Sequence, residues 1–135
     1  MAISTAVLLT VLATLSVACG GGGGGGDSGG PVATAPREGE AAKVELRLIA
    51  FKPERLSVRA GTTVTWTQGD AGAHTVTSGR VVQETAGVRQ EPDNRFSSGE
   101  LATGASFEYT FEEPGTFPYY CEIHPATMRG EITVT

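Results

Sequence analysis

Residues 115–134 read GTFPYYCEIHPATMRGEITV, and this stretch is the most informative part of the chain. Two short runs rich in aromatic and β-branched residues, 116–121 and 131–134, flank a compact loop. Runs of this length and composition are typical of β-strands. The loop carries, within eight residues, three side chains with soft or borderline donor atoms: Cys121, His124 and Met128. The stretch therefore predicts two strands joined by a loop that is suited to binding a metal.

Alternation of apolar and polar residues continues outward from this stretch across much of residues 43–135. Apolar residues occupy every second position in four runs: 44–48, 56–58, 64–66 and 107–111. A period of two indicates strands with one face toward a core, and the glycine and proline residues between the runs indicate turns. No run shows a helical stripe. The pattern predicts an antiparallel all-β sandwich or barrel, with four aromatic side chains in its core: Trp66, Phe107, Tyr109 and Phe111.

Two segments depart from this pattern. Pro118 lies inside a strand-like run, and because proline has no N–H to donate, we expect that strand at a sheet edge or beside a bulge. Residues 79–99 are polar and irregular, so we expect them to form an excursion from the sandwich and not a part of its core.

The first 18 residues contain no charged side chain and form a short apolar segment. Its apolar core is shorter than the roughly 20 residues that a membrane-spanning helix needs. It has the length of the hydrophobic region of a secretory signal peptide. A buried N-terminal helix is the alternative, but the segment has no polar face and glycines follow at once. We therefore predict that residues 1–18 are a signal peptide and that the protein is exported.

Cys19 follows this segment directly and precedes a glycine tract. Small residues before a cysteine at this position resemble a bacterial lipoprotein processing site, at which the cysteine becomes the lipidated first residue. The alternative is ordinary cleavage nearby, which removes Cys19 or leaves it free. Residues 19–42 have almost no apolar side chains to bury, so we expect a flexible tether. The protein would then be periplasmic or on the cell surface, held to the membrane by lipid on Cys19.

The overall composition, with 39% hydrophobic and 19% charged residues, is that of an ordinary globular protein. The net charge of −5 gives no support for nucleic-acid binding, which requires a basic face to neutralise phosphates. We expect residues 43–135 to fold as one domain that acts as a monomer.

Residues with metal-binding side chains are few, and they form one pattern. The chain has two histidines, His74 and His124, and Met128 is its only methionine besides the initiator. Taken one at a time, these residues have ordinary explanations: a histidine is commonly hydrogen-bonded, and cysteine and methionine are commonly buried in the core. Together they form the His₂Cys set with a weak axial methionine that marks blue-copper electron-transfer sites, whereas zinc prefers four ligands without a thioether. We therefore predict that one copper ion is bound by His74, Cys121, His124 and Met128.

Residues 115–134 also closely resemble the ligand loop of the cupredoxins in the plastocyanin, amicyanin and azurin group. The likeness extends to Phe51-Lys-Pro, to the run from Ala60 to Trp66, and to residues 70–77, which end in His-Thr-Val-Thr. It covers nearly all of residues 43–135. The spacing between His124 and Met128 is one residue longer than in the common His-Pro-x-Met form.

This resemblance implies a Greek-key β-sandwich that holds one Cu(I)/Cu(II) ion. It also implies that the Thr75 amide donates a hydrogen bond to the cysteine sulfur, and that His124 exposes its ring edge in an apolar patch where partners dock. Ile123 stands where plastocyanin-like loops carry proline, so its N–H is available as a second donor. Tyr120 matches the position of the family's second electron route, or else it simply covers the core.

The function that follows is transfer of single electrons between exported or membrane redox proteins. A copper-binding or delivery protein is the alternative, although such proteins favour methionine and histidine clusters that this sequence lacks. A structural sandwich with a vestigial site is a third interpretation, and the intact four-residue set argues against it. We do not expect an enzyme, because catalysis as in multicopper oxidases or nitrite reductases needs a second domain or further histidines.

Overall fold

β-Strands provide all the regular structure of residues 41–135, the part of the chain that the computed structural model describes. The predicted signal peptide, Cys19 and nearly all of the predicted tether lie outside this range. The strands are β1 Ala42–Leu46, β2 Phe51–Lys52, β3 Arg55–Val58, β4 Thr62–Gln68, β5 Thr77–Glu84, β6 Gly87–Ser97, β7 Ser106–Phe111, β8 Gly115–Tyr120 and β9 Arg129–Val134. Within the described residues there is no helix that could cross a bilayer.

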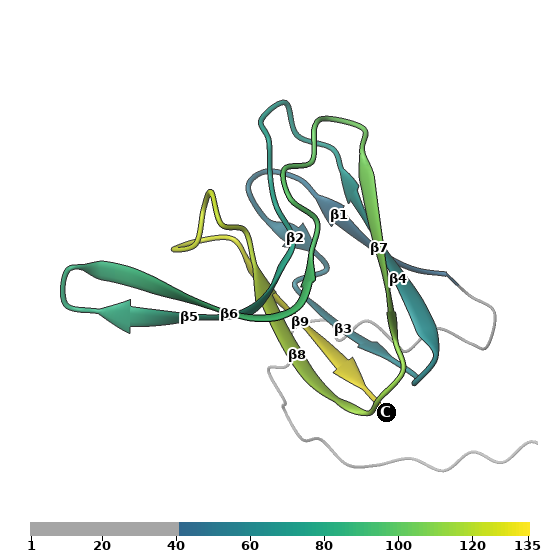
Figure 1. The fold of residues 1–135 in the computed structure, drawn as a ribbon. Coiled ribbons are helices and arrows are strands. Elements are labelled where there is room, and N and C mark those ends of the chain that lie inside the picture. The colour runs from purple at the N-terminus through teal and green to yellow at the C-terminus, as the bar shows by residue number, and fades with distance from the viewer. Residues whose placement is uncertain (1–40) are drawn as a thin grey trace, which may run out of the picture.

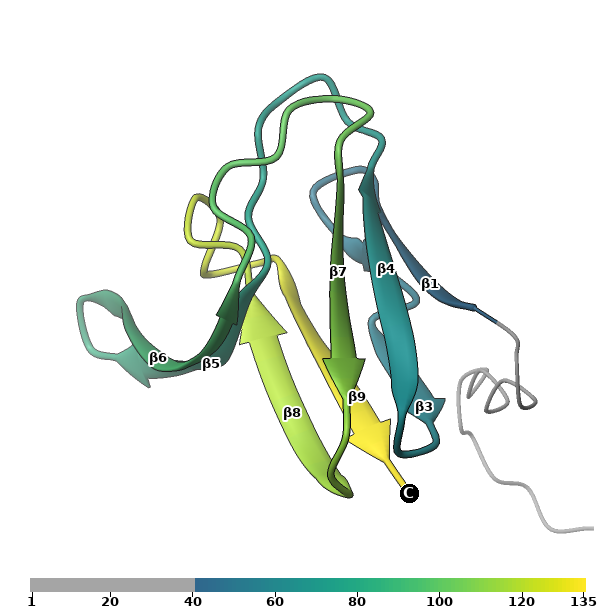
Figure 2. The same cartoon turned by 45° about the vertical axis from the view of Figure 1, so that its right-hand side comes forward.

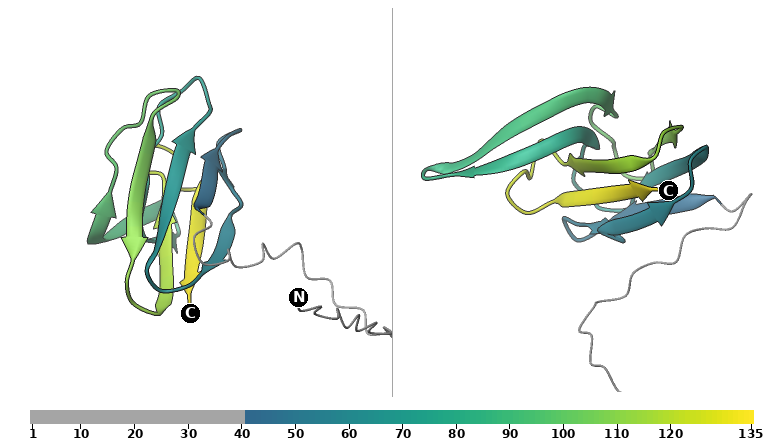
Figure 3. Two further views of the ribbon diagram at one scale, coloured as in Figure 1. Left: turned by 90° about the vertical axis from the view of Figure 1, so that its right-hand side faces the viewer. Right: turned by 90° about the horizontal axis from the view of Figure 1, so that it is seen from below.

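The strands form two sheets that pack face to face, as Figures 2 and 3 show. One sheet has the order β2-β1-β4-β7 and the other the order β3-β9-β8-β5-β6. Most neighbouring strands are antiparallel, but β1 runs parallel to β4 and β3 runs parallel to β9. Parallel neighbours need a long crossover connection, and the one between β1 and β4 contains β2 of the same sheet and β3 of the other sheet. The predicted all-β sandwich is confirmed.

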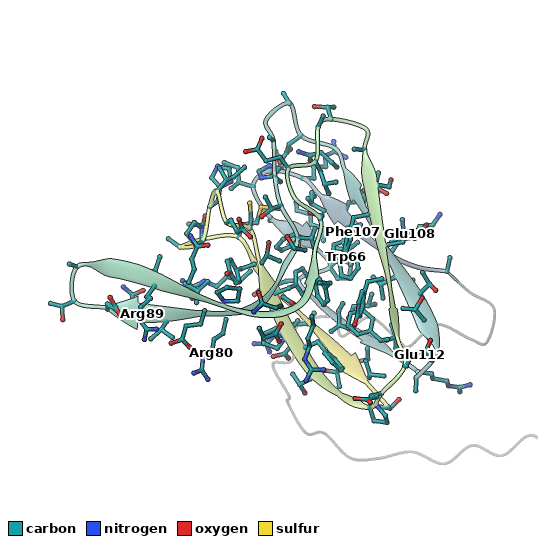
Figure 4. All side chains as sticks on the ribbon, viewed as in Figure 1. Trp66, Arg80, Arg89, Phe107, Glu108 and Glu112 are labelled. Carbon is teal, nitrogen blue, oxygen red and sulfur yellow. The ribbon has the colours of Figure 1, made fainter. Side chains whose placement is uncertain are left out.

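Alternate residues of β1, β3, β4 and β9 fill the space between the sheets, as the period of two requires. In β1 the buried positions are Ala42, Val44 and Leu46, and β4 and β9 show the same alternation. Trp66 of β4 is fully buried and packs edge-on against Tyr119 of β8, with 5.5 Å between ring centroids, so this pair joins the two sheets. Phe111 is also buried, and Phe107 and Tyr109 are partly buried against the same core. Figure 4 shows Trp66 and Phe107 close together, whereas Glu108 lies on the other side of β7.

The segment predicted to be irregular, residues 79–99, forms a regular hairpin. β5 and β6 pair from Gly79↔Pro92 to Glu84↔Gly87, and Figure 1 shows the hairpin projecting from the sandwich as an arm. Ion pairs link its strands, with Arg80 Nε lying 2.6 Å from Glu91 Oε2 and Arg89 Nε 2.6 Å from Glu84 Oε1. The excursion was therefore predicted correctly for the arm, but its irregularity was not, and the end of the segment is part of the core, because Phe96 is buried there against Trp66. A projecting two-stranded arm has no core on either face, so its sequence shows no alternation.

Of the two alternatives for the strand with Pro118, the edge is wrong and the neighbouring bulge is confirmed, and the extent of the first strand needs correction. The strand that contains Pro118 is not at an edge, because β8 lies between β9 and β5. The last pair between β5 and β8 is Ser78↔Tyr119, so Pro118, the next residue along the ladder, has no partner in β5. At the same place β5 changes register with β6, between Thr77 and Gly79. The missing N–H therefore falls where the ladder has ended. The first strand ends at Leu46, and Leu48, which continues the alternation in sequence, is exposed.

Four connections lie at one end of the sandwich, opposite the C-terminus (Figure 1). They are the β1–β2, β4–β5, β6–β7 and β8–β9 loops, and two of them contain the predicted metal ligands. The strands thus place residues from distant parts of the sequence at this end.

Candidate metal centre

His74 lies in the β4–β5 connection and is held by backbone bonds to the β6–β7 loop. The Leu101 N–H donates to the His74 carbonyl at 2.8 Å, and the His74 N–H donates in return at 3.4 Å. The His74 side chain is almost entirely buried, with 2% of its surface exposed. Backbone pairing on one side and packing on the other leave this ring little freedom to move.

Cys121, His124 and Met128 lie in the loop between β8 and β9, which closes on itself. The Cys121 N–H donates to the Met128 carbonyl at 3.0 Å, so the first and last residues of the loop are joined. Within it, the Met128 N–H donates to the His124 carbonyl at 2.9 Å and the His124 N–H donates to the Cys121 carbonyl at 3.2 Å. Cys121 and Met128 are fully buried, whereas His124 is half-buried.

The sulfur of Cys121 faces one ring nitrogen of each histidine. Its distances to His74 Nδ1 and to His124 Nδ1 are both 3.7 Å, and the three donor atoms lie within 4.8 Å of one another. Nitrogen and sulfur bonds of about 2.0–2.3 Å to a first-row divalent ion, arranged in a trigonal plane, put ligand atoms about 3.5–4 Å apart. The three atoms therefore fit around one such ion.

The predicted hydrogen bond to the thiolate is present. The Thr75 N–H donates to Cys121 Sγ at 3.4 Å, and it is the only backbone N–H that does so within residues 41–135. The second donor considered in the sequence, Ile123, makes no such bond and lies in an exposed turn. The hydroxyl of Thr75 in turn accepts the Glu122 N–H at 2.8 Å, which links the two ligand-bearing loops a second time.

Asp70 is a residue that the sequence reasoning missed. Its Oδ2 lies 3.0 Å from His74 Nε2, and its carboxylate also accepts the N–H groups of Leu48 and Ile49 at 2.8 and 3.0 Å. The hydrogen bonds from Ile49 and Leu48, and then the contact with His74, lower the pKa of Asp70 below its usual value. The available signal was a carboxylate four residues before a predicted ligand, since metal-binding histidines commonly pair their other nitrogen with such a group.

An apolar depression lies beside the two histidines. It is lined by Leu48, Ile49, Ala71 and Gly72 together with Asp70, His74 and His124. Leu48 is 73% exposed and Ile49 is 49% exposed, which is unusual for such large apolar side chains. Ile123, adjacent to His124, is 44% exposed. The prediction that His124 is more exposed than His74 is confirmed, and its surroundings are apolar.

The fold and the donor atoms together define a class of protein. A two-sheet sandwich that gathers two imidazole nitrogens and a thiolate sulfur at one end is a cupredoxin domain. The chain belongs to the plastocyanin/azurin family of copper binding proteins, whose model matches residues 40–135. Members of this family bind copper, so copper is the cofactor that the soft donor set at this end of the sandwich accommodates.

Relatives and solved structures agree with this assignment. The chain is 30% identical over 105 residues to amicyanin from Paracoccus versutus, with 77% of this chain and 72% of that protein covered. It is 37% identical over 93 residues to a chloroplastic plastocyanin from Physcomitrium patens, with 64% of this chain covered. In that comparison the chain spans about half of the relative, 51% of its length.

Among solved structures, a purple cupredoxin from Nitrosopumilus maritimus has a TM-score of 0.55 and 32% identity, over 70% of this chain and 99% of that chain. A copper-containing nitrite reductase from Thermus scotoductus has a TM-score of 0.57 and 30% identity, over 71% of this chain and 22% of the enzyme. The likeness to the enzyme is thus confined to one part of a much longer chain.

Proposed function

We propose that the protein is a non-enzymatic one-electron carrier in which His74, Cys121, His124 and Met128 bind one copper ion. When bound, copper supplies a couple between Cu(I) and Cu(II) that accepts and releases single electrons. The observation that carries the proposal is the equal 3.7 Å separation of Cys121 Sγ from the Nδ1 atoms of both histidines.

The surroundings of these side chains suit electron transfer, which is fast when few atoms move between oxidation states. The backbone bonds around His74 and across the 121–128 loop hold the donors in place. The Thr75 N–H withdraws charge from the sulfur and so favours the reduced state. Burial of His74, Cys121 and Met128 also argues against a delivery protein, which must release its metal to a partner.

His124 is the ligand through which we expect electrons to pass, because its ring reaches the surface among apolar side chains. Ala126 is exposed in the same loop. Ala126→Asp should slow electron self-exchange by about tenfold or more, since two copies of an acidic protein would bring like charges together at the contact. NMR line broadening in mixtures of the oxidised and reduced protein measures the rate.

The control for this variant is Thr116→Asp, which adds the same charge at an exposed position of β8, away from the metal centre. It should leave the rate near that of the unmodified protein. Both variants should keep the visible spectrum, because neither replaces a proposed ligand. Equal rates for Ala126→Asp and the unmodified protein would mean that electrons leave by another route, such as the one through Tyr120.

Met128 would be the fourth and weakest ligand of the copper ion, and the support is that it is fully buried and that its carbonyl closes the loop on Cys121. Met128→Leu should keep the blue colour and raise the reduction potential, because removing the thioether disfavours the doubly charged ion. Met128→Gln should lower the potential, because an amide oxygen stabilises Cu(II). We expect shifts of about 59 mV, a tenfold change in a one-electron equilibrium. Voltammetry that finds the original potential in both variants would remove Met128 from the ligand set.

We further propose that the protein is exported and held to a membrane by lipid on Cys19, with the glycine-rich segment as a tether and redox proteins as its partners. The support is the uncharged apolar segment 1–18, directly followed by Cys19 and glycines. Mass spectrometry of the membrane fraction should find diacylglycerol on Cys19. An unmodified Cys19 in a soluble protein would contradict the anchor and leave the electron-carrier proposal intact.

A further inference from the structure

The Asp70 carboxylate joins two parts of the molecule that are distant in sequence. Its Oδ1 accepts the Leu48 N–H at 2.8 Å and its Oδ2 accepts the Ile49 N–H at 3.0 Å. The same Oδ2 lies 3.0 Å from Nε2 of His74. One side chain in the β4–β5 connection thus contacts both the β1–β2 loop and the most buried histidine of the metal centre.

The contact with His74 determines which ring nitrogen carries the proton. Nδ1 of His74 faces Cys121 Sγ, and Nε2 faces the carboxylate. A carboxylate accepts hydrogen bonds and cannot donate them once ionised, so Nε2 must carry the hydrogen. The lone pair is then on Nδ1, where a metal ion bonded also to Cys121 requires it. Asp70 therefore selects the ring tautomer and orientation that metal binding needs.

The contact with the β1–β2 loop holds an unfavourable backbone. Leu48 and Ile49 have φ values of 58° and 54°, in the left-handed region that non-glycine residues rarely adopt and that β-branched residues avoid. This conformation directs two successive N–H groups to one carboxylate, while the Arg47 N–H donates to the Ala50 carbonyl at 2.9 Å. The strained turn also presents the Leu48 and Ile49 side chains to solvent beside His124.

We propose that Asp70 is a positioning residue that fixes both the orientation of His74 and the apolar surface formed by Leu48 and Ile49. The copper site and the surface beside its exposed ligand then depend on the same carboxylate. The negative charge next to His74 also favours the more highly charged state of a metal bound at Nδ1, and so lowers the reduction potential. In its copper-dependent part, this inference rests on the function proposed above.

The test compares Asp70→Asn and Asp70→Ala with Thr103→Val. The Thr103 hydroxyl donates to the Asp70 backbone carbonyl at 2.6 Å, so the control removes a hydrogen bond to the same turn and leaves the carboxylate in place. In metal-free protein, the Leu48 and Ile49 amides should lose hydrogen-exchange protection in both Asp70 variants and keep it in the control. Long-range ¹H–¹⁵N spectra should show a single Nε2–H tautomer for His74 in unmodified protein and a mixture in the variants.

In copper-loaded protein, both Asp70 variants should lose about tenfold or more in Cu(II) affinity. They should also shift the one-electron equilibrium toward Cu(I) by about tenfold, or about 59 mV. The proposal would be overturned if the Asp70 variants kept the copper affinity, the reduction potential and the His74 tautomer of the unmodified protein. Loss of exchange protection at Leu48 and Ile49 alone would mean that Asp70 holds only the β1–β2 loop. If unmodified protein bound no copper, the proposed function would fail, and the metal-free measurements would still decide the role of Asp70.

Discussion

Replacing Cys121 with serine is expected to abolish the blue colour and to reduce copper affinity by more than about 100-fold, beyond what loss of a supporting residue usually costs. The thiolate is the only anionic donor of the predicted set, and its charge transfer to Cu(II) produces the colour. A serine hydroxyl stays protonated at neutral pH and is a poor ligand for Cu(I). The domain should still fold, because Cys121 is one small buried side chain in a core built mainly from other residues. Absorption spectra and copper titrations measure both effects.

The matched control is Cys19→Ser, which changes the only other cysteine of the chain. It should leave the spectrum and the copper stoichiometry unchanged, because Cys19 is not one of the four proposed ligands. A blue Cys121→Ser protein would show that the colour arises elsewhere. Loss of colour in both variants would point to a thiol-dependent loading step and not to a ligand.

Trp66→Ala is expected to destabilise the fold by about 3–5 kcal/mol, the range found when large aromatic residues are removed from cores. Trp66 is fully buried and lies within 6.3 Å, between ring centroids, of four aromatic rings: Phe96, Phe107, Phe111 and Tyr119. It packs between the two sheets, so the cavity left by alanine cannot close without moving a strand. Such a loss is a large part of the 5–15 kcal/mol that typically stabilises a domain.

Trp66→Phe is the control for this prediction. It keeps an aromatic ring in the core and removes the buried indole N–H. It should therefore cost clearly less than alanine. Denaturant unfolding followed by circular dichroism gives both values. If Trp66→Ala unfolded at the denaturant concentration of the unmodified protein, Trp66 could not be the central contact between the sheets.

The strands that face the core could be predicted from the sequence because burial on one face imposes alternation. Val44, Val64 and Trp66 show this directly, and all three are fully buried. Leu48 continues the same alternation but lies outside the strand. The reason is a long-range one, since its N–H is bonded to Asp70, 22 residues away, and its backbone is left-handed. No local pattern reports such a contact.

The metal centre was predictable to a different extent. The ligand loop could be predicted from the side-chain types of Cys121, His124 and Met128 and from their closeness in sequence. His74 could be predicted because the chain has only one other histidine, and because of the family resemblance. The partners of the ligands were harder to find. Thr75 was found by analogy, but the link from Asp70 to His74 and to the β1–β2 loop depends on how three segments meet at one end of the sandwich.

The most direct test of the central claim is a titration of the purified, metal-free protein with Cu(II), followed by absorption and electron paramagnetic resonance. We expect an end point at one copper per chain, an intense blue thiolate-to-copper band, and the narrow hyperfine splitting of a thiolate-bound type 1 site. One electron per chain should bleach the band, and reoxidation should restore it. A colourless product with the spectrum of ordinary nitrogen- and oxygen-bound Cu(II), or a band that one-electron reduction does not remove, would show that the protein is not a blue-copper electron carrier.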